Sequence, residues 1–211
     1  MPEVIFNGPA GRLEGRYHPA KQKNAPIAMV LHPHPQFRGN MNHPIVYQVY
    51  YAFAARGFSV LRFNFRGVGD SEGAFDGGPG EVADAAAALA WLRAEGPAAS
   101  TCWIAGYSFG AWIGLRLVKQ AAGIDGFVAV SPPPNHFDFS FLAPCPAPGL
   151  ILQGGRDAIA PAAEVERLVA ELGASVAYER VEAADHFWMN DLSEIERRAG
   201  AYVDRRLGRG P

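Results

Sequence analysis

The chain has 211 residues, of which 49% are hydrophobic and 19% are charged, and its formal net charge is −2. This length and composition are typical of a globular protein with one sizeable core, so we expect a single domain over residues 1–211. The small net charge argues against a partner that is a nucleic acid or a membrane surface, and no apolar run is long enough to span a bilayer.

The N-terminal residues and the cysteines indicate a cytoplasmic protein. Residues 1–7 lack the basic start and the long apolar core of a signal peptide. Cys102 falls in an expected buried strand and Cys145 in an expected loop, so we expect two free thiols rather than a disulfide.

Apolar runs typical of buried strands alternate with helical patterns along the chain. Residues 4–6 and 12–17 are expected to form a hairpin at one edge of a sheet. The further expected elements are a strand at 26–31, a helix at 45–56, a strand at 58–65, a helix at 79–95, a strand at 101–105, a helix at 111–118, strands at 127–130 and 150–153, a helix at 162–172, a strand at 176–181 and a helix at 190–207. This alternation predicts an α/β fold, a three-layer sandwich with a mostly parallel sheet between helices.

The stretch Gly106-Tyr107-Ser108-Phe109-Gly110 lies between an expected strand and an expected helix. This is the setting that the G-x-S-x-G nucleophile elbow requires, where a sharp turn presents the serine hydroxyl. We therefore predict that Ser108 is a catalytic nucleophile.

Two further polar residues follow expected strands, as residues at the ligand-binding edge of an open α/β sheet do. Asp157 follows the strand at 150–153, and His186 follows the strand at 176–181. A serine hydroxyl needs a base to attack, and histidine titrates near neutral pH, so His186 is the expected base and Asp157 the group that orients it. Asp138 is the alternative acid, whereas Asp125 precedes a strand and so lies at the opposite edge.

The oxyanion of a tetrahedral intermediate needs two donors. The backbone N–H of Phe109 is the expected first donor, because it follows the nucleophile. The second should come from the loop after residues 26–31, where Pro33 and Pro35 have no N–H. His34 or Gln36 must supply it, and the spacing favours His34.

The chain resembles the α/β-hydrolase superfamily from about residue 26 onward. The resemblance rests on the Ser108 pentapeptide, on Gly-Gly-Arg-Asp ending at Asp157, on Asp185-His186, and on the glycine-rich run at 66–73. The segment 31–39, with its His-Pro-His-Pro, is similar to a small esterase-like or dienelactone-hydrolase-like subgroup, although Pro33 replaces the glycine of the commoner His-Gly loop. The resemblance implies hydrolysis without a cofactor.

Many α/β-hydrolases insert a cap domain after the strand that ends here at Val130. Only residues 131–148 separate that strand from the next, so we expect no cap domain and a fairly open site. The expected walls are aromatic or apolar residues near strand ends that suit a small or medium acyl group: Phe37, Trp112, Phe137, Phe139, Phe141, Trp188 and Met189.

A metal site is not expected. His32, His34 and His43 have no accompanying cysteine or carboxylate cluster, and we expect them to brace the oxyanion loop by hydrogen bonds.

The sequence thus predicts a carboxylesterase-type serine hydrolase that acts on a small-molecule ester through an acyl-enzyme. A thioesterase, an amidase or peptidase, or an acyltransferase could use the same three residues. A binding module that keeps the fold without catalysis is the alternative from a different class. The oligomeric state is not predicted.

Overall fold

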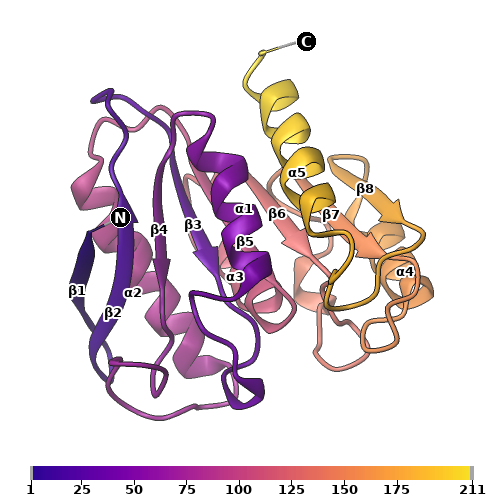
Figure 1. Ribbon diagram of the computed structural model, residues 1–211, viewed down its shortest axis with the longest axis horizontal. Helices are drawn as coiled ribbons and strands as arrows, with labels where there is room; N and C mark the ends of the chain where they lie inside the picture. The colour runs from indigo at the N-terminus through magenta and orange to yellow at the C-terminus, as the bar shows by residue number, and fades with distance from the viewer. Residues whose placement is uncertain (1, 210–211) are drawn as a thin grey trace.

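Eight strands form one sheet in the computed structural model, which describes residues 2–209 (Figure 1). The strand order is β1-β2-β4-β3-β5-β6-β7-β8. The strands are β1 (Glu3–Gly8), β2 (Gly11–His18), β3 (Ile27–Leu31), β4 (Ser59–Phe63), β5 (Cys102–Tyr107), β6 (Gly126–Val130), β7 (Gly149–Gly154) and β8 (Val176–Val181). The expected edge hairpin is confirmed: β1 and β2 pair antiparallel, β2 joins β4 antiparallel, and the other strands run parallel.

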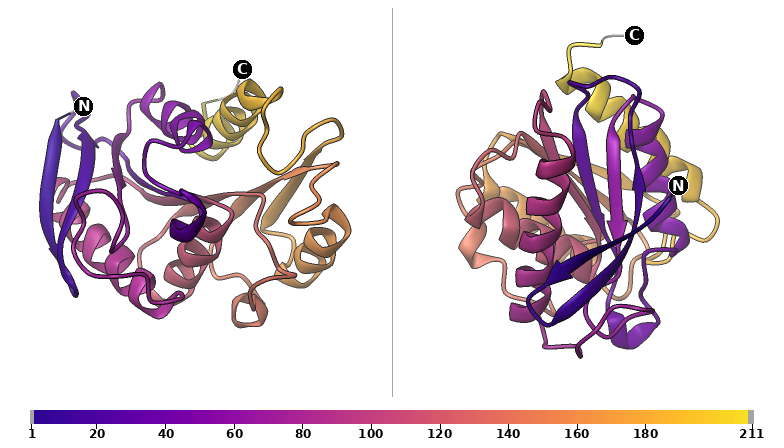
Figure 2. Two further views of the ribbon diagram at one scale, coloured as in Figure 1. Left: turned by 60° about the horizontal axis from the view of Figure 1, so that its bottom comes forward. Right: turned by 90° about the vertical axis from the view of Figure 1, so that its left-hand side faces the viewer.

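Within the described residues, five α-helices cover the two faces of this sheet (Figure 2). They are α1 (Pro44–Ala54), α2 (Pro79–Glu95), α3 (Phe109–Gln120), α4 (Ala162–Leu172) and α5 (Leu192–Arg206). Helices α2, α3 and α4 pack with one apolar cluster on one face, and α1 and α5 pack with a second cluster on the other. The predicted three-layer α/β sandwich is therefore confirmed.

The central strands are buried along their whole length. Every residue of β3, β4, β5, β6 and β7 is buried, as expected for parallel strands covered on both faces. Their carboxyl ends meet at one edge of the sheet, which is where ligands bind in open α/β folds.

Residues 131–148, all of which the structure describes, hold one short 3-10 helix at Ser140–Leu142 and no inserted domain. The expectation of a cap-less site is confirmed. Cys102 and Cys145 are both free thiols. Within residues 2–209 no helix combines the length and the apolar character needed to cross a membrane.

Candidate active site

Ser108 forms the sharp turn between β5 and α3. Its backbone has φ 54° and ψ −118°, a region that costs a non-glycine residue about 1–3 kcal/mol and is found mainly at functional sites. The turn depends on its flanking glycines. A Cβ on Gly106 would overlap the backbone of Gly110, and a Cβ on Gly110 would overlap the carbonyls of Leu31 and His32. The elbow therefore packs directly on the end of β3.

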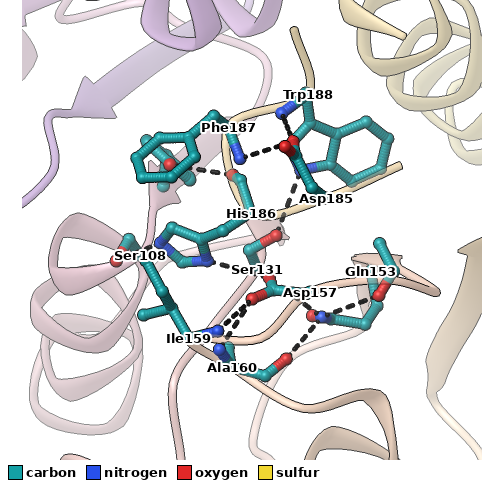
Figure 3. Close-up of polar contacts among 12 residues, drawn as sticks. Ser108, Ser131, Gln153, Asp157, Ile159, Ala160, Asp185, His186, Phe187 and Trp188 are labelled. Atoms are coloured by element: carbon teal, nitrogen blue, oxygen red, sulfur yellow. Dashed lines mark hydrogen bonds and ion pairs between the residues drawn. The ribbon is translucent and has the colours of Figure 1, made fainter. Parts of the chain in front are cut away.

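The three predicted residues form one hydrogen-bonded chain at the carboxyl edge of the sheet (Figure 3). Ser108 Oγ lies 3.2 Å from His186 Nε2, and His186 Nδ1 lies 2.8 Å from Asp157 Oδ2. An ionised carboxylate only accepts hydrogen bonds, so Nδ1 carries the proton and Nε2 is free to accept the serine proton. This is the arrangement that general-base activation of a hydroxyl requires.

Asp157 is held by hydrogen bonds to both carboxylate oxygens. Oδ1 accepts the backbone N–H groups of Ile159 and Ala160 at 2.9 and 2.7 Å, and Oδ2 also accepts from Gln153 Nε2 at 3.1 Å. Burial opposes ionisation of Asp157, but hydrogen bonding and charge from His186, with the two backbone donors, lower the pKa of this carboxyl below its usual value. Asp157 therefore stays ionised beside the imidazole.

The other aspartates lie elsewhere. Asp138 is exposed and accepts the N–H of Ser140, and Asp125 accepts the N–H of Cys102 at the first residue of β5. Asp185, the neighbour of His186, accepts the N–H groups of Phe187 and Trp188 and so shapes the loop. Of these aspartates, only Asp157 hydrogen-bonds to the histidine.

Two backbone N–H groups near Ser108 are available as oxyanion donors. In the described part of the chain, neither the N–H of Phe109 nor that of His34 donates a hydrogen bond. The N–H of Gln36, by contrast, donates to the His34 Nδ1 atom at 3.3 Å. His34 also lines the cavity in front of Ser108, and Gln36 does not. The geometry favours His34 over Gln36 as the second donor.

His32 braces the loop that carries His34. It is fully buried, its Nδ1–H donates to the carbonyl of Pro33 at 2.7 Å, and its Nε2 accepts the N–H of Phe65 at 3.0 Å. Burial lowers the pKa of His32 to about 3, so the ring is neutral at physiological pH. A neutral ring that donates on one side and accepts on the other ties the end of β3 to the segment after β4.

A cavity of about 590 Å³ opens in front of Ser108. Phe37 and Phe137 line it, as predicted, together with residues that the sequence did not single out as walls: His43, His136, Ile159 and Phe187, with Pro33, Tyr107 and Pro133. The lining includes no Asp, Glu, Lys or Arg side chain. The cavity is therefore suited to an uncharged ligand.

Five of the seven predicted walls do not line this cavity: Trp112, Phe139, Phe141, Trp188 and Met189. Trp112 lies behind Phe137, with the ring centroids 4.5 Å apart, and its indole N–H donates to the carbonyl of Asp138. Trp188 is fully buried in the core beside α5, and its indole N–H donates to Ser131 Oγ at 3.1 Å. The chain adopts φ 55° at Trp188, so its ring is in the core while the neighbouring Phe187 lines the cavity.

Comparison with known proteins supports the same assignment of fold. Residues 15–198 match the family described as X-Pro dipeptidyl-peptidase (S15 family). An uncharacterized protein of Rickettsia prowazekii is 49% identical, covering 96% of this chain and 89% of that protein.

Two solved structures are similar over nearly the whole chain. A protein of unknown function from Agrobacterium tumefaciens, provisionally described as an α/β hydrolase, is 53% identical with a TM-score of 0.95, covering 98% of this chain and 97% of its own. An α/β serine hydrolase without a lid from Xanthomonas campestris is 31% identical with a TM-score of 0.89, covering 98% and 94%. The chain belongs to the S15 family of the α/β-hydrolase fold, and its structural relatives include a serine hydrolase without a lid.

Proposed function

We propose that this protein is a serine esterase that cleaves uncharged carboxylic esters of small or medium acyl groups. The observation that carries the proposal is the hydrogen-bonded chain Ser108–His186–Asp157, which opens onto a largely apolar cavity without Asp, Glu, Lys or Arg side chains. Strain at Ser108 and saturation of the Asp157 carboxylate support a preorganised site.

The chemistry follows from the positions of the atoms. Ser108 Oγ attacks the ester carbonyl while His186 Nε2 takes its proton, and the oxyanion is held by the N–H groups of Phe109 and His34. The imidazolium then gives the proton to the leaving alcohol, and Asp157 stabilises its charge. Water enters with His186 again as base, which releases the acid and regenerates Ser108.

A peptidase is the second candidate, because the family match is to dipeptidyl-peptidases. A substrate of that kind carries an N-terminal ammonium, and a buried or half-buried ammonium needs an anionic partner. Among the residues that line the cavity none is acidic, and Asp157 is already bonded to His186 and three other donors. An uncharged ester fits this lining better than an X-Pro dipeptide.

The test compares three substrates on the purified protein: p-nitrophenyl butyrate, its thioester analogue and Gly-Pro p-nitroanilide. We expect kcat/KM to be largest for the ester and the anilide to be cleaved at least about 100-fold more slowly, because an ammonium left without a partner costs several kcal/mol. A larger kcat/KM for the anilide would replace the esterase with a peptidase, and a larger one for the thioester would indicate a thioesterase.

The matched variants are Ser108→Ala and Ser193→Ala, since Ser193 is an exposed serine on α5. Ser108→Ala should abolish turnover of the ester, and Ser193→Ala should leave it unchanged. No turnover of any of the three substrates by the wild type would favour a binding module.

A further inference from the structure

His43 lies beside the proposed catalytic histidine but is not needed for the proton transfers described above. It caps the N-terminus of α1, where its Nδ1 accepts the N–H of Ile45 at 3.3 Å. Its ring packs 5.2 Å from the ring of Tyr107, and the ring of His186 lies 5.3 Å from that same tyrosine. His43 also lines the cavity with Ser108 and His186.

The cap determines the tautomer of His43. Because Nδ1 accepts a hydrogen bond, the proton of the neutral ring is on Nε2, which then is a donor. Among residues 2–209, no acceptor hydrogen-bonds to this Nε2–H. The Nε2 atom is also not fully buried. The half-buried ring of His43 lines the cavity and thus carries one N–H without a partner.

His43 is also a neutral donor. Burial lowers the pKa of His43, and the nearby charge of His186 lowers it further, so the ring is uncharged at neutral pH. A neutral N–H donates to an ether, hydroxyl or carbonyl oxygen without attracting an anion.

The position of His43 determines which part of the substrate it meets. His186 delivers its proton to the leaving oxygen, so the alcohol portion of an ester leaves on the His186 side of Ser108. His43 is on that side, because it shares the Tyr107 ring with His186, whereas His34 lies by Phe109 at a ring distance of 5.0 Å.

We propose that His43 is a specificity-determining residue that selects esters whose alcohol portion carries an uncharged oxygen acceptor close to the ester bond. The donor is His43 Nε2–H, and the substrate class is the ester of an ether- or hydroxyl-bearing alcohol. This proposal rests on the proposed esterase function and adds the identity of the leaving group to it.

The test uses two butyrate esters of nearly equal shape. 2-Methoxyethyl butyrate and n-butyl butyrate share the acyl group and differ by one ether oxygen in place of a methylene. The release of acid is followed in a pH-stat, and the measured quantity is the ratio of kcat/KM for the ether ester to that for the alkyl ester. Both esters are measured on each variant, so the difference in their intrinsic reactivity is the same in every ratio. A change in the ratio between variants therefore measures recognition of the ether oxygen.

The two informative variants remove the donor in different ways. His43→Asn keeps a good N-cap residue but is too short to place an N–H where Nε2 lies. His43→Phe keeps a ring against Tyr107 but has no N–H. His18→Asn is the control, since His18 is on β2, does not line the cavity and contacts Tyr50.

We expect the ratio to fall about fivefold in both His43 variants, mainly through KM, and to be unchanged in His18→Asn, as the loss of one neutral hydrogen bond predicts. An unchanged ratio in either His43 variant would overturn the proposal, because a purely structural role would slow both esters alike. If the wild type cleaves both esters and Ser108→Ala cleaves neither, an unchanged ratio counts against His43 alone. If the wild type cleaves neither ester, both the proposed function and this inference fail.

Discussion

The hydroxyl of Tyr107 donates a hydrogen bond to the backbone carbonyl of His186 at 2.9 Å. The residue before the nucleophile thus ties the end of β5 to the loop that carries the histidine, 79 positions further along the chain. Burial raises the pKa of Tyr107 above its usual value, and the charge of Asp157 adds to this effect, so the hydroxyl keeps its proton and is a permanent donor.

Tyr107→Phe should therefore loosen the His186 loop. The buried carbonyl would lose its donor, which costs about 1–3 kcal/mol of the free energy of unfolding, and we expect kcat to fall several-fold as His186 becomes less well placed. Tyr17→Phe is the matched control, because Tyr17 is also buried and its hydroxyl donates no hydrogen bond in the described part of the chain. Urea unfolding and ester kinetics measure both effects, and equal losses in the two variants would contradict this account.

Asp157→Asn should lower kcat by about 10³–10⁴, since an amide at this position favours the wrong imidazole tautomer. The comparison variant is Asp138→Asn, which changes the alternative acid. Asp138 is exposed, and its side chain accepts the N–H of Ser140, a bond that an asparagine oxygen also accepts. Kinetics on p-nitrophenyl butyrate separate the two assignments: a large loss in Asp138→Asn with activity retained in Asp157→Asn would show that Asp157 is not the acid.

The buried histidine His32 should make the protein sensitive to acid. Its pKa is about 3 in the folded protein and near 6.5 when unfolded, so below pH 6.5 the unfolded chain binds a proton that the folded chain does not. The contribution of His32 to the free energy of unfolding is therefore complete above pH 6.5. As the pH drops from 6.5 toward 3, the free energy of unfolding should fall by up to about 1.4 kcal/mol per pH unit.

Urea unfolding of the wild type and of His32→Gln at pH 7, 6, 5 and 4 checks this. Glutamine can donate and accept but does not titrate in this range, so the variant should be less stable at pH 7 and should lose stability less steeply with acid. Parallel curves for the two proteins would mean that His32 is not the buried neutral group responsible.

Gly110→Ala should damage both stability and catalysis. Its new Cβ would overlap the carbonyls of Leu31 and His32, so the end of β3 and the elbow must separate. We expect a loss of about 1–3 kcal/mol in the free energy of unfolding, together with a fall in kcat, because the N–H groups of Phe109 and His34, the proposed oxyanion donors, would move apart. A variant as stable and as active as the wild type would refute the close packing of these two segments.

Much of the fold could be predicted from periodicity and from turn residues. The expected bounds of α2, α4 and β8 agree with the structure residue for residue. The strand expected at 58–65 ends instead at Phe63. Phe65 is buried like a strand residue, but its N–H donates to the His32 side chain rather than to a neighbouring strand. Hydrophobicity alone does not distinguish a strand residue from a buried residue that lies just beyond the end of a strand.

The sequence also predicted which three side chains meet, because each follows a strand at the same edge of the sheet. The cavity walls were harder to predict. Trp188 adopts a positive φ that no local sequence signal indicates for a tryptophan, and Trp112 is covered by Phe137 from a distant loop. The histidine pattern singled out His43 but did not place it at the cavity. Its proximity to His186 arises because both rings pack against Tyr107 at the end of β5, a contact between distant parts of the chain.

The central claim is that Ser108 is the nucleophile, and the most direct measurement locates a covalent adduct on it. The protein is treated with a fluorophosphonate, digested and analysed by mass spectrometry, with and without excess p-nitrophenyl butyrate. We predict one adduct, on the peptide containing Ser108, that is absent in Ser108→Ala and is suppressed by the ester. An adduct on a different residue, or equal labelling of wild type and Ser108→Ala, would contradict the account.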